Sequence, residues 1–217
     1  MAEITLPTKT IGSGQDAQVI PLIEFTERQG PRLAVEERSL SPIWARTEEH
    51  VFQYDRYWVG SCVIKPVGRS GGLDGEAINA VLNLLQQRGN YTTLDLSLPT
   101  YDATLDGSLA LNSTSTAEQP DQSIKLVFSS LTVSQRNSKM GVGRWVDWGG
   151  RAYQIQRHNT SNSNLYLVGP EPPAKASNLF PALAPLTGIK ARLGQVNPIV
   201  RGGIYQAWSI SWIEWTG

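Results

Sequence analysis

The sequence predicts a mainly β protein that carries one strong α-helix. Short runs rich in β-branched and aromatic residues recur along most of the chain, separated by Gly, Pro, Asn or Ser. Only one segment has the apolar spacing of an amphipathic helix. At 217 residues, the chain can bury a sizeable core, either as one domain or as a domain with a smaller insertion.

The predicted strands share a high content of Val, Ile, Thr, Tyr and Trp. They lie at residues 18–27, 50–67, 91–99, 124–133, 144–158, 164–170, 189–194 and 204–215. The last run shows the strand period most clearly, because Trp208, Ile210 and Trp212 alternate with small residues and share one side of the strand. That side is expected to face a core.

The predicted helix covers residues 75–88. Its apolar residues Ile78, Val81, Leu82 and Leu85 follow the i, i+3, i+4, i+7 spacing, which places them in one stripe along the helix. Such a stripe needs a partner, so we expect this helix to pack on a sheet.

Several glycines precede this helix, which raises the alternative of a phosphate-binding loop. The chain contains no Gly-Lys-Ser/Thr sequence, and the first glycine of the dinucleotide fingerprint is missing. We therefore expect Gly71, Gly72 and Gly75 to turn the chain and Asp74 to cap the start of the helix. Gly89 is placed to end the helix in a left-handed conformation.

Two polar or proline-rich segments interrupt the strand pattern. Residues 100–123 contain many turn-forming residues and little to bury, which predicts a domain junction or an exposed excursion. Residues 169–188 carry most of the later prolines, which favours an extended connection over a central strand.

Charge and hydropathy narrow the class of protein. The 19 basic and 19 acidic residues cancel, so no net field attracts the chain to nucleic acid or to an anionic membrane. The N-terminal segment lacks the pattern of a secretory leader, and no run of about 18 apolar residues could span a membrane. These features predict a soluble protein.

Side chains able to do chemistry are few, and we predict no enzyme activity, no cofactor and no metal site. The single cysteine, Cys62, lies in an apolar run and is expected to be a buried small side chain. His50 and His158 lack the spacing of metal ligands. The carboxylates closest in sequence, which could form an acid/base pair across a cleft, are Glu24, Glu27, Glu36, Glu37, Glu48 and Glu49.

The seven tryptophans are candidates for a core, for a subunit interface or for sugar stacking. Trp58, Trp208 and Trp212 lie in alternating strands and are expected to be buried. The expected interface residues are Trp44, Trp145, Trp148 and Trp215; of these, the last three lie beside glycines or near the chain end.

Four segments taken in order resemble the structural proteins at the tail tip or baseplate of long-tailed bacteriophages, of the distal tail protein type. They are a strand–helix–strand unit at 56–99, a glycine-turned hairpin at 142–158, a strand ending in paired prolines at 164–173, and a closing strand pair at 189–215. In the hairpin, Gly149 and Gly150 are expected to supply positive φ angles.

The resemblance implies an antiparallel β-sandwich with one packed α-helix and a smaller inserted β domain. The sandwich would comprise residues 1–104 and 184–217, and the inserted domain residues 105–183. Copies would form a homo-oligomeric ring, commonly a hexamer, that joins the tail tube protein to the tail hub or baseplate of the virion, with no nucleic-acid or membrane partner. The N-terminal segment 2–14 is expected to add a strand to a neighbouring copy.

Two other functions stay open from the sequence. A carbohydrate-binding β-sandwich would use tryptophans on one exposed sheet face as platforms for sugar rings. A glycoside hydrolase would need two of the carboxylates named above to face each other across a cleft.

Overall fold

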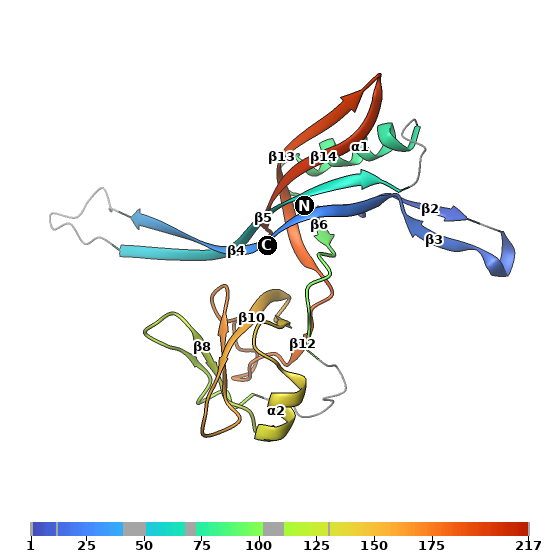
Figure 1. Ribbon diagram of the computed structural model, residues 1–217. Coiled ribbons are helices and arrows are strands. Elements are labelled where there is room, and N and C mark those ends of the chain that lie inside the picture. Colours follow the sequence, from blue (N-terminus) through green and yellow to red (C-terminus); the bar gives the residue numbers. More distant parts are fainter. Residues whose placement is uncertain are drawn as a thin grey trace. The chain divides into compact units, whose positions relative to one another are not determined.

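The protein is built mainly from β-strands, as its computed structural model shows for residues 2–11, 13–40, 51–67, 73–101, 111–129 and 131–216 (Figure 1). The predicted fold class, a mainly β sandwich-like protein with a packed helix, is confirmed. The chain divides into two compact units. Unit 1 comprises Met1–Arg32, Trp58–Leu96 and Lys190–Gly217, and unit 2 comprises Leu33–Tyr57 and Ser97–Ile189.

The larger part of unit 1 belongs to a six-stranded sheet. Its strands, in spatial order, are β1 (Ala2–Glu3), β6 (Asn90–Leu94), β13 (Ile189–Arg201), β14 (Ile204–Glu214), β5 (Val51–Pro66) and β4 (Ile23–Leu40). Strand β1 runs parallel to β6, whereas β14 is antiparallel to both β13 and β5. Within the described residues, the N-terminal strand β1 therefore pairs with a strand of its own chain.

Helix α1 (Leu73–Leu85) packs on this sheet against β14 and β6. Its apolar stripe is confirmed, because Ile78, Leu82 and Leu85 are buried. On the sheet side, the Trp208 indole Nε1–H donates a hydrogen bond to the Asn79 Oδ1 of the helix at 3.1 Å. Trp208, Ile210 and Trp212 are all buried, as the strand alternation predicts.

The start of α1 differs from the sequence prediction. The helix begins at Leu73, so Asp74 lies in its first turn and does not cap it. Gly75 does not turn the chain; it lies inside the helix, where a β-carbon would approach Tyr205 Cβ to 3.0 Å. Gly71 and Gly72 lie outside the described residues. The helix ends at Leu85 and not at residue 88, so Gly89 does not end it, although its φ of 92° is left-handed as expected.

A two-stranded hairpin forms a separate small sheet in unit 1. Strand β2 (Thr8–Ile11) pairs antiparallel with β3 (Gln18–Pro21), and the short 3-10 helix η1 (Gly14–Asp16) lies between them. In Figure 1 this hairpin projects from the body of the sheet.

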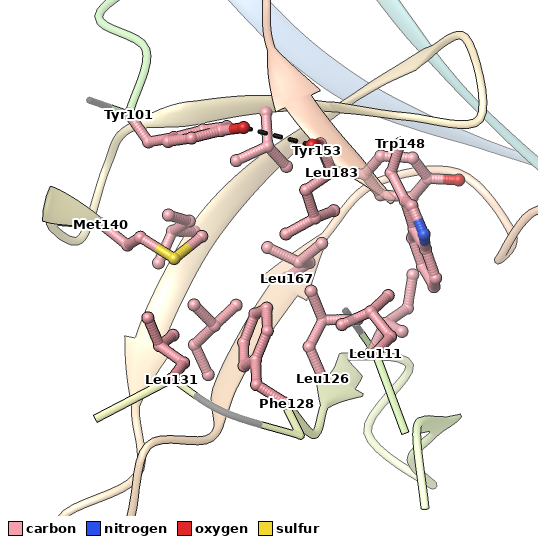
Figure 2. Close-up of a cluster of buried hydrophobic side chains, with 14 residues drawn as sticks. Tyr101, Leu111, Leu126, Phe128, Leu131, Met140, Trp148, Tyr153, Leu167 and Leu183 are labelled. Carbon is pink, nitrogen blue, oxygen red and sulfur yellow. Dashed lines mark hydrogen bonds between the residues drawn. The ribbon is translucent and has the colours of Figure 1, made fainter. Parts of the chain in front are cut away.

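Unit 2 is organised around an antiparallel sheet. Its strands, in spatial order, are β12 (Leu183–Pro185), β9 (Trp145–Trp148), β10 (Arg151–His158), β11 (Leu165–Val168), β8 (Ile124–Leu126) and β7 (Ala117–Glu118). One side-chain cluster fills its core (Figure 2), in which the Tyr101 hydroxyl donates to the Leu183 carbonyl oxygen at 3.2 Å.

Unit 2 also contains a second helix, α2 (Val133–Lys139), where the sequence predicts a strand running to Val133. A capping box forms this helix start: the Thr132 side chain accepts from the Gln135 backbone N–H, and the Gln135 side chain accepts from the Thr132 backbone N–H. The side chain of each of these two residues thus accepts a hydrogen bond from the backbone N–H of the other.

The unit boundaries differ from the predicted domain boundaries, because residues 97–104 and 184–189, predicted in the sandwich domain, belong to unit 2. Residues 97–189 contain the whole predicted insertion, but the central part of the β4–β5 hairpin, Leu33–Tyr57, groups with them. One contact behind this grouping is the buried Arg56, which donates to the Gln122 carbonyl oxygen at 2.8 Å and forms an ion pair with Glu118. Because these partners are far from Arg56 in sequence, no local sequence pattern predicts the contact.

Candidate assembly interface

Trp145 and Trp148, two of the four predicted interface residues, lie in the interior. Their exposed fractions are 3% and 0%. The Trp148 Nε1–H donates to the Pro181 carbonyl oxygen at 2.9 Å, and its ring packs against those of Tyr153 and Phe180. Figure 2 shows Trp148 and Tyr153 within the core cluster of unit 2. Strand β9 is an inner strand between β12 and β10, so the glycine turn that follows it does not expose its side chains. Neither indole can form a contact between copies in this conformation.

The other two predicted residues have different outcomes. Trp215 is half-buried, because its ring stacks on Tyr91 with 4.0 Å between ring centroids and a 12° interplanar angle. It retains some accessible surface. Trp44 lies outside the described residues.

The β2–β3 hairpin is a stronger candidate surface. All of its strand residues are exposed except Ile20, which is half-buried. Ile11 and Val19 are 53% and 68% exposed and lie on opposite faces, because Val19 pairs with Thr10. An isolated two-stranded hairpin is marginally stable in water. The β2–β3 hairpin should therefore become more stable when another surface covers it.

The hairpin is held at its base by contacts within unit 1. The Leu22 N–H donates to the Pro7 carbonyl oxygen at 2.9 Å. An ion pair joins Lys9 Nζ to Asp74 Oδ2 at 3.8 Å, with the lysine side chain 55% exposed. Such a surface pair contributes little energy.

The tip of the β13–β14 hairpin forms a second exposed apolar surface. Ile199, Val200 and Ile204 are 44%, 47% and 49% exposed. Gly202 and Gly203, with φ angles of 58° and 77°, make the tight turn between the two strands. In Figure 1 this tip and the β2–β3 hairpin lie at different corners of unit 1.

Among the described residues, the candidate catalytic carboxylates do not come together in one site. Glu24 and Glu36 are exposed and lie far apart on one strand, β4. The side chains of Glu27 and Glu37, and the whole of Glu48 and Glu49, lie outside the described structure, as does His50. Among the described residues, no group of three or more His, Cys, Asp or Glu side chains could hold a metal ion.

Cys62 and His158 both have structural roles. Burial raises the pKa of the Cys62 thiol to about 12, although the Arg28 charge lowers it slightly, and the side chain is 3% exposed. The prediction of a buried small side chain is confirmed. A ring N–H at His158 Nε2 donates to the Met140 carbonyl oxygen at 2.7 Å, which ties β10 to the end of α2.

Sequence reasoning missed the exposed aliphatic residues of both hairpins. A signal was present for the second hairpin, where the sequence Ile-Val-Arg-Gly-Gly-Ile places three apolar residues around a two-residue turn. Side chains at a hairpin tip extend beyond the sheet and have few neighbours in their own chain. The large tryptophan side chains, apart from the half-buried Trp215, fill the core where the structure describes them.

None of the described helices is long and apolar enough to cross a membrane. No protein family, curated protein or solved structure matches the chain.

Proposed function

We propose that this chain is a non-enzymatic structural protein of a tailed bacteriophage, which forms a homo-oligomeric ring, with six copies by the resemblance, at the distal end of the tail tube. The ring links the tube protein to the hub or baseplate. The chain is made in the host cytoplasm and ends in the virion. The observation that carries the assembly is the pair of exposed apolar hairpins at different corners of unit 1.

A ring of identical copies needs two different surfaces on each copy. In a head-to-tail contact, one patch of a subunit meets a different patch of the next, and the series closes if the rotation allows. The β2–β3 hairpin offers Ile11 and Val19, and the β13–β14 tip offers Ile199, Val200 and Ile204. We assign these two patches to the two sides of the contact.

The energy available from such a contact is substantial. Full burial of a Val or Ile side chain contributes about 1.5–3 kcal/mol relative to its exposed state. Part of this offsets the loss of rotational and translational freedom on association. Covering the β2–β3 hairpin also orders an element that has little cover in its own chain, so assembly and hairpin stability should be linked.

Two surface variants test the head-to-tail arrangement by native mass spectrometry. A hairpin variant (Ile11→Ser with Val19→Ser) and a tip variant (Ile199→Ser with Ile204→Ser) should each lose the ring. Mixed in equal amounts, they should bind each other through the one intact pair of patches, because each retains one patch, but they should not close a ring. A complex absent from the mixture would contradict the assignment.

The matched control is Leu179→Ser. Leu179 is 62% exposed in unit 2 and belongs to neither hairpin. This variant should keep the ring of the unmodified chain. Loss of the ring in the control as well would show that assembly responds to surface hydrophobicity in general, which would remove the support for these patches.

The place of the ring in a virion needs a separate observation. An antibody raised against the chain should label one end of the tail in electron micrographs of phage particles that contain it. Labelling of the head, or along the whole tail, would contradict a distal ring even if the purified chain forms rings.

The carbohydrate-binding alternative requires tryptophans on an exposed sheet face. All the described tryptophans are buried except Trp215, which is half-buried and stacked on Tyr91. The described tryptophans therefore do not form an exposed platform for sugar rings.

A further inference from the structure

Strand β4 forms an open edge of the six-stranded sheet. It is 18 residues long, and among the described strands only β5 pairs with it. Proline is found on edge strands with its nitrogen facing away from the neighbouring strand, and Pro31 lies in the middle of β4. Residues two apart present their backbone groups to the same side of a strand. Leu33 and Val35 therefore present their N–H and C=O groups outward with Pro31.

The five residues from Arg32 to Glu36 read Arg-Leu-Ala-Val-Glu, and we call them the RLAVE segment. The segment is complementary to its own reverse, because a cation and an anion stand at its two ends with three aliphatic residues between them. Since β4 is one continuous strand, strand geometry alone sets these spacings.

The side chains of the RLAVE segment are accessible. Arg32 and Glu36 are exposed, Val35 is 51% exposed, and Leu33 and Ala34 are half-buried. The Tyr57 hydroxyl lies 3.5 Å from Glu36 Oε2 and holds this carboxylate on its face of the hairpin. The Arg32 guanidinium makes no hydrogen bond or ion pair with any residue that the structure describes.

We propose that two copies of this chain pair antiparallel along their β4 edges, with a two-fold axis at Ala34. Arg32 of each copy then lies directly opposite the second copy's Glu36, and both ion pairs form on one face. On the other face, Leu33 lies opposite the second copy's Val35, and these two residues exchange both backbone hydrogen bonds. The occupant of the edge is thus a second copy of the chain.

Charge disfavours two other arrangements of this edge. Parallel pairing in register places Arg32 opposite Arg32 and Glu36 opposite Glu36, and like charges directly opposite each other destabilise a sheet. An antiparallel register centred on Gly30 is no better, because it places Arg28 opposite Arg32 and Glu24 opposite Glu36.

A third register, centred on Thr26, also pairs opposite charges, namely Glu24 with Arg28. Arg28, however, is already engaged in its own chain. Its Nη1 donates to the Leu96 carbonyl oxygen at 2.5 Å, and its guanidinium lies 5.4 Å from the centroid of the Phe25 ring. Pairing in that register would break the contacts of Arg28 with Leu96 and Phe25, whereas Arg32 has no such contacts with the described residues.

This contact goes beyond the proposed ring and does not depend on it. The β4 pairing is isologous, with the same segment on both sides, whereas the ring contact joins two different hairpins. The hairpin and tip variants described above leave β4 unchanged. Loss of one contact can therefore be measured while the other is intact.

Charge reversal tests the pairing by sedimentation velocity. Arg32→Glu and Glu36→Arg should each weaken self-association at least about tenfold, since each variant faces like charges with like. An equal mixture of the two should associate as well as the unmodified chain, because two carboxylates then face two guanidinium groups. The double variant, with both changes in one chain, should also recover.

Glu24→Arg is the matched control, because it reverses a charge on the same face of β4 but outside the RLAVE segment. It should leave self-association unchanged. Single variants that associate normally, or a mixture that fails to recover, would overturn the proposal. Weakening by Glu24→Arg alone would overturn this register in favour of the one centred on Thr26.

A cross-link locates the two-fold axis. Ala34→Cys should form a disulfide between copies under mild oxidation, because residues on the axis lie opposite each other within disulfide range. Thr26→Cys should not. The native Cys62 is 3% exposed and does not compete. Absence of the Ala34→Cys cross-link, or its persistence when Arg32→Glu is added, would overturn the pairing.

Discussion

The indole ring of Trp212 occupies the space over Gly60 that a side chain would fill. The two residues are direct cross-strand partners on β14 and β5, and a β-carbon on Gly60 would lie 2.5 Å from Trp212 Cζ2. Trp212 is 1% exposed, and its Nε1 has no hydrogen-bond partner among the residues that the structure describes. The glycine therefore allows a large aromatic side chain to lie flat on the sheet beneath helix α1.

Gly60→Ala should lower the free energy of unfolding by about 1–3 kcal/mol, because the added methyl group displaces the Trp212 ring from a packed core. Urea titration followed by tryptophan fluorescence measures this change. Gly30→Ala is the control, since a β-carbon there meets no atom within 4 Å. Equal stability of the two variants would contradict the close contact.

Cys62 should make stability depend on pH in the alkaline range. Its pKa is about 12 in the folded chain, against 9.0 for an ordinary thiol. Below about pH 9 both states keep the proton, so the thiol has no effect. As the pH rises from 9 toward 12, only the unfolded state releases the proton, and stability falls by up to about 1.4 kcal/mol per pH unit.

The Cys62→Ala variant isolates this effect, because other groups also titrate above pH 9. Urea titrations of both proteins from pH 8 to 10.5 should show a steeper decline for the unmodified chain. The native thiol should also resist alkylation at pH 8 until the protein is unfolded, since the thiolate is the reactive form. Parallel pH profiles for the two proteins would contradict the raised pKa.

Arg136 should be a major stabilising residue of unit 2. It is 3% exposed, and its Nη1 donates to the carbonyl oxygens of Asn159 at 2.7 Å, Asn164 at 3.1 Å and Asn162. Burial lowers its pKa, and the charge is satisfied by carbonyl dipoles. Arg136→Met should destabilise the chain by about 2–4 kcal/mol, because it removes hydrogen bonds from a charged donor to three carbonyl oxygens of the 159–164 loop.

Hydrogen exchange distinguishes this role of Arg136 from simple packing. Amides of residues 159–164 should exchange faster in Arg136→Met, because the loop loses the group that gathers its carbonyls. Val133→Ser, at a 41% exposed position of the same helix, serves as the control and should leave that loop protected. Unchanged exchange in Arg136→Met would show that the loop does not depend on the guanidinium.

The glycine turn between β9 and β10 offers a matched pair of variants. Gly149 and Gly150 have φ angles of 66° and 82°, so alanine is strained at both positions. A β-carbon on Gly149 would also lie 2.6 Å from Pro173 Cβ, whereas one on Gly150 meets open space. Gly149→Ala should therefore cost about 1–3 kcal/mol more than Gly150→Ala. Similar melting temperatures would contradict the close approach of Pro173.

Local patterns predicted the elements whose side chains repeat with a clear period. The stripe containing Ile78 and Leu82 predicted helix α1, and the alternation around Trp212 predicted the buried face of β14. Gly149 and Gly150 predicted the turn of their hairpin, with positive φ at both positions. Short elements were harder, because α2 has only seven residues and shows no long apolar stripe. Its capping box, Thr132 with Gln135, was the readable signal.

The candidate interface could not be predicted in the same way. Trp148 and Val19 both lie on strands beside turn-forming residues, yet one is fully buried and the other 68% exposed. The difference arises from the neighbours: β9 is enclosed by β12 and β10, whereas β3 pairs only with β2 among the described strands.

The sequence by itself determined that the chain is mainly β, where its principal helix lies and which faces of its clearest strands are apolar. Periodicity carries this information, because the spacing of apolar residues follows directly from backbone geometry. Only the tertiary structure decided which tryptophans are enclosed, which hairpins project and that β4 ends its sheet. Those properties depend on strand order, which is set by contacts between residues far apart in the chain.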